Sequence, residues 1–234
     1  MTVTLLFVHS PLVGPTTWAL TADVLRTNGF RCYVPDMTGV ASAGPPYYPK
    51  FADVAAQALH GTGDEPVVLV GHSAAGPLLP AIADVLSGRV GAAVFADAQL
   101  PHPGLSWLDT APAPLREQLL GMVRDGLLPP WHEWFPPGAI AELLPDRELR
   151  RKLVAEVPRL PVAYFEEAAP ATRNWDTLRR ALLRFSAPYD LAADEAERLG
   201  WWVARKDWDH LRMLTAPVAV ADLIAQAISA TLAD

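Results

Sequence analysis

The sequence predicts an α/β fold with a mostly parallel sheet of about six strands and helices on both faces. Two observations predict it: short unbroken apolar runs recur along the chain, and segments with helical spacing lie between them. Unbroken apolar runs are typical of strands covered on both faces, and strands that alternate with helices form parallel sheets. A third observation, the loss of this rhythm between residues 100 and 175, predicts an inserted segment of another kind.

The expected elements follow in order. The strands are residues 3–8, 31–35, 67–70, 91–96, 181–186 and 201–205, and the helices are residues 17–28, 51–60, 74–86, 191–199 and 217–232. Gly29, Gly88 and Gly200 stand where glycine ends a helix. We therefore assign residues 1–99 and 176–234 to one core.

The segment 100–175 is rich in proline and tryptophan. It holds twelve of the 23 prolines, and its tryptophans are Trp107, Trp131, Trp134 and Trp175. Because proline ends helices and cannot donate to a strand ladder, we expect short helices near 113–124 and 146–157 joined by loops. Such a segment above the carboxyl edge of the sheet would form a helical lid over an apolar pocket, with Trp131 and Trp134 lining it and Tyr47 and Tyr48 as another wall.

Composition and charge narrow the classes of function. Of 234 residues, 51% are hydrophobic and 19% are charged, which is too apolar for a disordered chain. Acidic residues outnumber basic ones, 26 to 19, and no stretch concentrates lysine and arginine, so we expect no nucleic-acid partner. The single cysteine, Cys32, has no second thiol for a disulfide.

The amino-terminal residues bear on localisation. MTVTLLFVH is too short an apolar stretch to span a bilayer and has no charged leader, which predicts a cytoplasmic protein with no membrane partner. We expect a small hydrophobic molecule as its partner. The sequence leaves the oligomeric state open, a homodimer included.

The segment after the third expected strand carries the strongest motif. VVLV is followed by Gly71-His-Ser-Ala-Ala-Gly76 and then by a helical pattern. A serine between small residues at a strand-to-helix turn has the geometry of a nucleophile elbow, which lifts the hydroxyl of Ser73 above the sheet edge. The pattern departs from G-x-S-x-G because Ala75 takes the last position and glycine follows at Gly76. The alternative interpretation is a serine that only caps the helix.

With this motif, nearly the whole chain resembles the α/β-hydrolase superfamily, in particular its small esterase branch that includes plant methylesterases and hydroxynitrile lyases. The residues that carry the resemblance are LLFVHSPLVGPTTWALTADVLRTNGFRCYVPDMTG, VVLVGHSAAG and DHLRMLTAPVAVADLI. The resemblance implies an α/β-hydrolase fold with the lid inserted between that family's strands six and seven. It also implies Ser73 as nucleophile and His210 as general base, with neither cofactor nor metal.

Two carboxylates compete for the third catalytic position. Asp190 closes LLRFSAPYD, which is similar to the family's strand-seven pattern, although an aspartate before a helix is also a common cap. Asp97 ends the strand after the elbow and resembles the strand-six acid of haloalkane dehalogenases, although loop amides would satisfy such a carboxylate equally well. Both alternatives stay open.

The loop after the first strand breaks the family pattern. Relatives have His-Gly-x there, and the N–H of x is one of two oxyanion donors; this chain reads His9-Ser10-Pro11. Ala74 supplies the other N–H, but proline has none. The Ser10 hydroxyl, the N–H of Leu12 or a lid residue would have to substitute, since one lost donor costs about 3 kcal/mol in the barrier.

These observations predict an enzyme with one of two chemistries. The first is a serine hydrolase, an esterase or thioesterase, that acts on a hydrophobic small-molecule ester through a Ser-His-Asp triad. The second is a lyase or cyclase that uses the same Ser73 and His210 for proton transfer without acylation. The break at Pro11 favours the second chemistry, and the serine and histidine motifs fit both.

Overall fold

The computed structural model describes residues 3–173 and 175–232. The outermost residues of the expected core, 1–2 and 233–234, and residue 174 of the expected insertion lie outside this range.

One six-stranded sheet forms the centre of the fold, and every neighbouring pair of its strands is parallel. Its order is β2-β1-β3-β4-β5-β6. The strands are β1 (Thr4–Val8), β2 (Arg31–Tyr33), β3 (Val67–Ser73), β4 (Val90–Ala98), β5 (Arg179–Arg184) and β6 (Trp202–Arg205). The α/β architecture and the parallel sheet expected from the sequence are confirmed.

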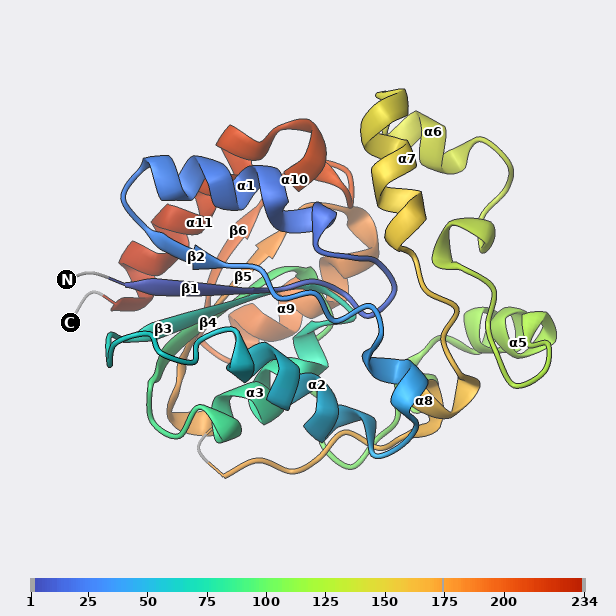
Figure 1. Ribbon diagram of the computed structural model, residues 1–234, viewed down its shortest axis with the longest axis horizontal. Coiled ribbons are helices and arrows are strands. Elements are labelled where there is room, and N and C mark those ends of the chain that lie inside the picture. The colour runs from blue at the N-terminus through green and yellow to red at the C-terminus, as the bar shows by residue number, and fades with distance from the viewer. Residues whose placement is uncertain (1–2, 174, 233–234) are drawn as a thin grey trace.

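Helices cover both faces of this sheet (Figure 1). On one face lie α1 (Thr16–Thr27) and α11 (Pro217–Leu232), which contact each other, with the short α10 (Arg212–Thr215) beside them. On the other face α2 (Tyr47–Gln57) contacts α3 (Leu79–Val85), and α9 (Asp190–Arg198) packs on β5 and β6. Two 3₁₀ turns, η1 (Val40–Ala43) and η5 (Ala187–Tyr189), complete the core.

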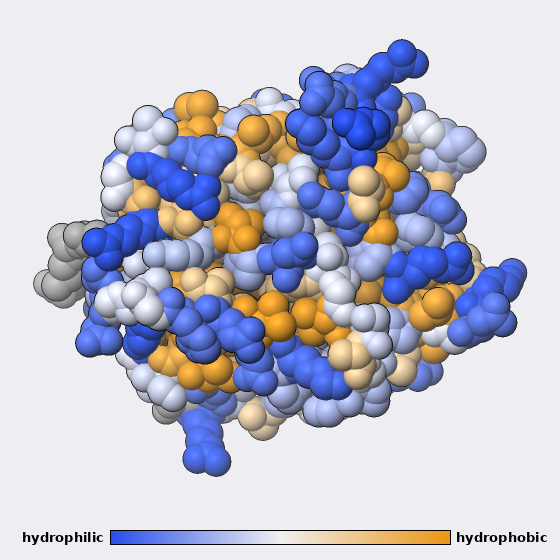
Figure 2. All heavy atoms as spheres, viewed as in Figure 1, coloured by the Kyte–Doolittle hydropathy of each residue, from blue (hydrophilic) through white to orange (hydrophobic). Residues whose placement is uncertain are grey.

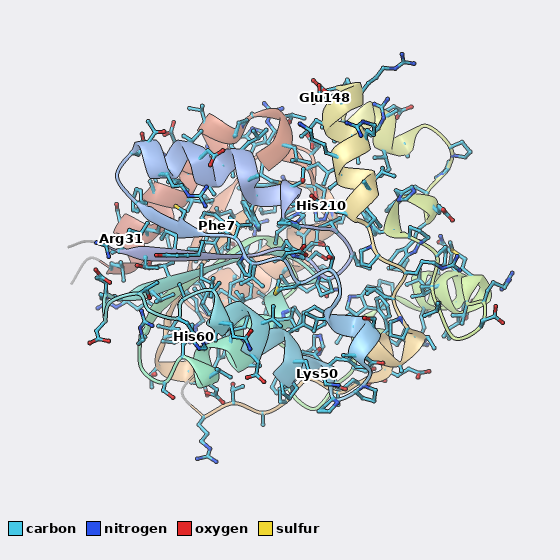
Figure 3. All side chains as sticks on the ribbon, viewed as in Figure 1. Phe7, Arg31, Lys50, His60, Glu148 and His210 are labelled. Atoms are coloured by element: carbon cyan, nitrogen blue, oxygen red, sulfur yellow. The ribbon has the colours of Figure 1, made fainter. Side chains whose placement is uncertain are left out.

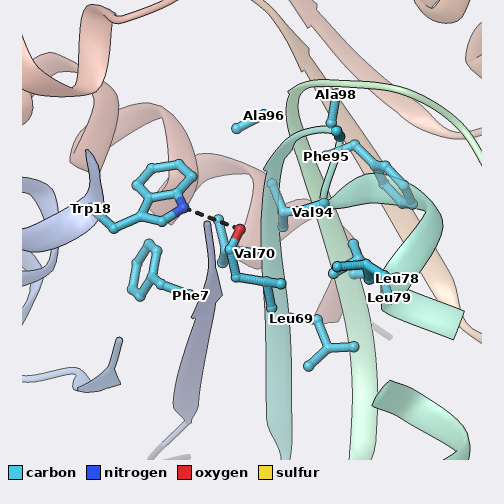
Figure 4. Close-up of a cluster of buried hydrophobic side chains, with 14 of the residues drawn as sticks. Phe7, Trp18, Leu69, Val70, Leu78, Leu79, Val94, Phe95, Ala96 and Ala98 are labelled. Atoms are coloured by element: carbon cyan, nitrogen blue, oxygen red, sulfur yellow. Dashed lines mark hydrogen bonds between the residues drawn. The ribbon is translucent and has the colours of Figure 1, made fainter. Parts of the chain in front are cut away.

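The interior of the core is a continuous apolar cluster (Figure 4). Phe7 on β1 packs against Trp18 on α1 with ring centroids 5.0 Å apart, and both side chains are fully buried. The indole N–H of Trp18 donates to the main-chain oxygen of Val8 at 3.3 Å. This bond satisfies the one polar atom of the indole, as a buried tryptophan requires.

The chain between β4 and β5 consists of short helices joined by loops. They are α4 (Trp107–Thr110), α5 (Ala113–Met122), η3 (Trp131–Glu133), α6 (Ala139–Leu143), α7 (Arg147–Glu156), α8 (Val162–Glu166) and η4 (Trp175–Thr177). Helices α5 to α8 lie on the side of the core toward which the strands run (Figure 1). Hydrophilic side chains gather over α7, near the top of this view (Figure 2).

Two glutamates of the insertion bind the first turns of core helices. Glu156 at the end of α7 accepts from the N–H of Thr16 at 2.9 Å and from its hydroxyl at 2.5 Å. Glu167, just after α8, accepts from the N–H groups of Tyr47 and Tyr48 at 2.8 to 3.0 Å. Each carboxylate thus satisfies N–H groups that a helix leaves open at its start.

Two core helices, α2 and α3, begin more than one residue away from the expected position. Helix α3 begins at Leu79 instead of residue 74, after a 3₁₀ turn, η2 (Gly76–Leu78), because Pro77 and Pro80 have no N–H to donate to the preceding turn. Helix α2 begins at Tyr47, so Tyr47 and Tyr48 lie in a helix and not in a loop; both are buried against Tyr164 of α8.

The strand order changes direction between β1 and β3, and the loops after these two strands diverge to opposite faces of the sheet. Open α/β sheets bind ligands at such a switch point, outside the carboxyl ends of the strands. Among the described residues, no helix has the length and apolar character needed to cross a membrane.

Candidate active site

Ser73 ends β3 at the switch point and has a φ of 58°, in the left-handed region that non-glycine residues seldom adopt. Its carbonyl accepts from the N–H of Gln99 at 3.1 Å. Gly76 makes the tight turn after it possible, because a Cβ there would collide with the main-chain oxygen of Gln99. The turn therefore has the strained geometry of a nucleophile elbow, with glycine one residue later than in G-x-S-x-G.

His210 lies in the loop after β6, on the side of the core that faces the insertion (Figure 3). The loop is fixed to the residue after β5 by the N–H of Trp208, which donates to the carbonyl of Phe185 at 2.8 Å. Nε2 of His72 lies 3.0 Å from the carbonyl oxygen of His210. These contacts hold Nε2 of His210 3.1 Å from Oγ of Ser73.

Asp97 reaches the other nitrogen of this imidazole, with Oδ2 2.7 Å from Nδ1 of His210. Its side chain is fully buried, and its φ is 45°. In the pairing of β3 with β4, His72 faces Ala96 whereas Ser73 faces Ala98, so Asp97 is the extra residue of a bulge. A bulge changes the direction of a side chain, and this one takes the Asp97 side chain out of the face-to-face alternation of β4.

Three further donors hold the Asp97 carboxylate. Oδ1 accepts from the N–H groups of Phe185 and Ser186 at 2.7 and 2.9 Å, and Oδ2 accepts from the Ser186 hydroxyl at 2.5 Å. With His210, the buried carboxylate has four hydrogen-bond partners, which satisfies a group that is otherwise costly to bury.

Asp190, the other candidate acid, points away from this group. Its carboxylate accepts from Nε of Arg184 at 2.6 Å and lies 3.7 Å from Arg205, and 45% of the side chain is exposed. The hydrogen bond from Arg184 lowers the pKa of Asp190. The structure therefore brings Asp97, and not Asp190, to His210.

Tyr189 contacts Ser73 and His210, although no sequence motif indicates it. Its hydroxyl lies 3.2 Å from Oγ of Ser73, and its ring stacks on the His210 imidazole with centroids 5.2 Å apart and planes 7° apart. Burial raises the pKa of this phenol. The only signal in the sequence is its position immediately before Asp190, in the segment that resembles the acid-bearing loop.

Two more histidines lie buried beneath the site. His9 accepts from the N–H of Met37 at Nε2, and its Nδ1 donates to the carbonyl of Ser10. The ring of His72 packs 4.4 Å from that of His210. Burial lowers the pKa of both His9 and His72, so both rings are neutral. Neither belongs to a metal site: the residues described contain no cluster of His, Cys, Asp or Glu with suitable geometry.

Ser10 lies in the loop after β1, at the edge of the sheet where β3 ends with Ser73. Val8, the last residue of β1, pairs with Gly71 of β3, and Ser10 and Ser73 each follow this pair by two residues. Ser10 is almost fully buried, and its Oγ accepts from the N–H of Leu12 at 3.2 Å. The N–H of Leu12, expected as a substitute oxyanion donor, is therefore already engaged. The Ser10 hydroxyl hydrogen stays available, since that bond uses only its oxygen.

Pro11 and Ala74 differ in whether they offer a main-chain N–H near Ser73. Pro11 follows Ser10 without an N–H. The N–H of Ala74, directly after Ser73, meets no acceptor within residues 3–173 and 175–232. The Ala74 N–H and the Ser10 hydroxyl are therefore two donors whose hydrogens have no acceptor among the described residues.

The insertion brings one of its two expected tryptophans to the site. Trp131 lies with its ring 6.3 Å from the imidazole of His210 and packs on Phe135. Trp134 packs on Phe165, and its indole N–H donates to the carbonyl of Pro129, within the insertion. Trp131 therefore lies near His210, whereas Trp134 packs within the insertion.

A family model agrees with this geometry. The model for the alpha/beta hydrolase family matches residues 5–223. The chain belongs to the alpha/beta hydrolase family. No curated protein matches the sequence significantly.

Solved structures show the same hydrolase fold. An extracellular alpha/beta-hydrolase from Paenibacillus species is 18% identical, with a TM-score of 0.78 over 97% of this chain and 99% of that chain. A pyrethroid hydrolase from Sphingobium faniae is 17% identical, with a TM-score of 0.72 over 96% of both chains. A methylesterase from Arabidopsis is 17% identical, with a TM-score of 0.69 over 98% of this chain and 99% of that chain. The fold and family that the sequence resembles are thereby confirmed.

Proposed function

We propose that this hydrolase-family protein is a serine esterase that cleaves a small hydrophobic carboxylic ester through an acyl-enzyme. The observation that carries the proposal is the continuous series of contacts from Asp97 through His210 to Ser73, at 2.7 and 3.1 Å. Asp97 orients the imidazole, His210 accepts the proton, and Ser73 attacks, which is the arrangement of a catalytic triad. The esterase and hydrolase relatives that share the fold are consistent with it.

The reaction follows from the hydrogen bonds. Because the Asp97 carboxylate accepts, Nδ1 of His210 donates and Nε2 accepts the Ser73 hydroxyl hydrogen. As Oγ bonds to the ester carbonyl carbon, Nε2 takes the proton and then delivers it to the leaving alcohol as the C–O bond breaks. A water that gives a proton to Nε2 then attacks the acyl-enzyme, and the proton returns to Ser73 as the carboxylic acid leaves.

The proposed oxyanion site combines the N–H of Ala74 with the Ser10 hydroxyl. The Leu12 N–H, which donates to Oγ of Ser10, polarises that hydroxyl toward the substrate oxygen. A side chain thus replaces the main-chain donor that Pro11 lacks.

The insertion serves as the lid in this proposal. Only 8% of Ser73 and 18% of the His210 side chain are exposed, so the reacting groups lie in a nearly dry site. Trp131 of the insertion lies against His210 and supplies an apolar wall. An apolar, water-poor site favours a hydrophobic acyl or alcohol group.

Pro11 supports one alternative, a lyase or cyclase that uses the same residues. A site with a weakened oxyanion hole stabilises a tetrahedral intermediate less well, whereas Ser73 and His210 still transfer a proton. Such an enzyme would act without an acyl-enzyme.

Turnover of p-nitrophenyl acetate and p-nitrophenyl butyrate tests the proposal. We expect the wild-type protein to hydrolyse both esters and to react with a fluorophosphonate probe, and Ser73→Ala to do neither. Ser42→Ala, an exposed serine, is the matched control and should behave like the wild type. A wild-type protein that takes up the probe without hydrolysing either ester would favour the alternative.

A further inference from the structure

The hydrogen bonds around Ser73 have only one consistent direction. His210 uses Nδ1–H for Asp97, so Nε2 must accept, and the Ser73 hydroxyl donates to it. The only hydrogen of Ser73 Oγ is then engaged. The hydroxyl of Tyr189, 3.2 Å from the same Oγ, must therefore be a donor to it.

Tyr189 is held rigidly in this role. The 3₁₀ turn η5 ends at Tyr189 and begins one residue after Ser186, which donates to Asp97. The phenol ring lies nearly parallel to the imidazole of His210, with planes 7° apart. One loop after β5 thus fixes both the carboxylate and the phenol.

The environment of Tyr189 favours the neutral phenol. Burial raises the pKa of Tyr189, and the nearby charge of Asp97 raises it further. It therefore acts as a neutral donor and does not compete with His210 as a base.

Resting on the proposed function, we infer that Tyr189 is a fourth catalytic residue, whose hydroxyl donates to Oγ of Ser73 and stabilises the negative charge that develops there as His210 removes the proton. Charge builds on Oγ before the new C–O bond is complete, and a preorganised donor in a dry site lowers the energy of that charge. In the resting enzyme the same bond orients the Ser73 hydroxyl toward Nε2. Asp190, next along the chain, has no such contact.

The variant Tyr189→Phe tests this inference, because it removes the hydroxyl and keeps the stacked ring. We expect kcat/KM for p-nitrophenyl acetate and the rate of fluorophosphonate labelling to fall together by about tenfold or more, with KM and Tm unchanged. The matched control is Tyr33→Phe, which removes a half-buried phenol hydroxyl from β2. This strand is two strands away from β3, which carries Ser73, so the rates of the control should match those of the wild type.

Three other outcomes would overturn the inference. Rates for Tyr189→Phe within about twofold of the wild type would overturn the inference and leave the proposed function intact. A loss of rate that accompanies an equal loss of folded protein, seen as a fall in Tm, would make Tyr189 structural and would also overturn it. A wild-type protein that neither turns over the ester nor takes up the probe would overturn the proposed function together with the inference.

Discussion

Oδ2 of Asp97 lies 2.7 Å from Nδ1 of His210, although 113 residues separate them in the chain. A bulge at the end of β4 and three donors from the loop after β5 hold the carboxylate in place. The orientation of the imidazole therefore depends on elements far apart in the sequence.

Substituting the two candidate acids separates their roles. Asp97→Asn should lower kcat by about 10³- to 10⁴-fold, because an amide no longer favours the imidazole tautomer that accepts from Ser73. The matched control Asp190→Asn changes a part-buried ion pair with Arg184 that does not include His210, so kcat should stay within about twofold of the wild type. Steady-state rates with p-nitrophenyl acetate check both, and equal mild losses would contradict the assignment.

The hydroxyl of Ser10 should prove essential to the proposed oxyanion site. Ser10→Ala should lower kcat by about a hundredfold, since it removes one of two donors. The double variant Ser10→Ala/Pro11→Ala restores a main-chain N–H at residue 11 and should recover part of the loss. Ser10→Ala with the kcat of the wild type would show that another group binds the oxyanion.

Stability should fall below neutral pH because of two buried histidines. Burial lowers the pKa of His9 and His72 from the ordinary value of 6.5, so below that pH the unfolded chain binds protons that the folded protein does not. The free energy of unfolding should therefore decrease as pH falls from 6.5 toward 5, by up to about 1.4 kcal/mol per pH unit for each histidine.

Urea unfolding at several pH values measures this slope. His72→Gln removes one of the two titrating rings and should reduce the slope by about half. A slope that is unchanged in His72→Gln would mean that other groups cause the pH dependence.

Glu167 should stabilise the contact between the insertion and the core. Its carboxylate accepts from the N–H groups of Tyr47 and Tyr48, so Glu167→Ala leaves the start of α2 without an acceptor and should cost about 1 kcal/mol. Glu166→Ala, an exposed neighbour on α8, is the control and should leave the stability unchanged. Urea unfolding compares the two, and equal effects would contradict this role.

The sequence predicts the core of the fold well because local patterns determine it. Each of the six strands overlaps an unbroken apolar run, and α11 spans residues 217–232 as expected. The start of α3 differs because Pro77 and Pro80 force a 3₁₀ turn first. The serine motif places Ser73 correctly at the end of β3, since a nucleophile elbow is a local structure.

The rest of the site depends on tertiary contacts that no local pattern encodes. The bulge that directs Asp97 to His210 arises from the register between β3 and β4, so the sequence leaves Asp97 and Asp190 equivalent. The sequence does not predict Tyr189 as a site residue for the same reason. A tyrosine before an aspartate is not a motif, and only the path of the loop after β5 brings its hydroxyl to Ser73.

The central claim is that Ser73 forms a covalent acyl-enzyme. Its most direct test is mass spectrometry of protein that is mixed with p-nitrophenyl acetate, quenched in acid within the first turnovers and mapped by peptides. The account predicts one acetyl group on the peptide that contains Ser73, and none on the same peptide of Ser73→Ala. Ester turnover by the wild type with Ser73 unmodified, or with the acetyl group on another residue, would contradict it.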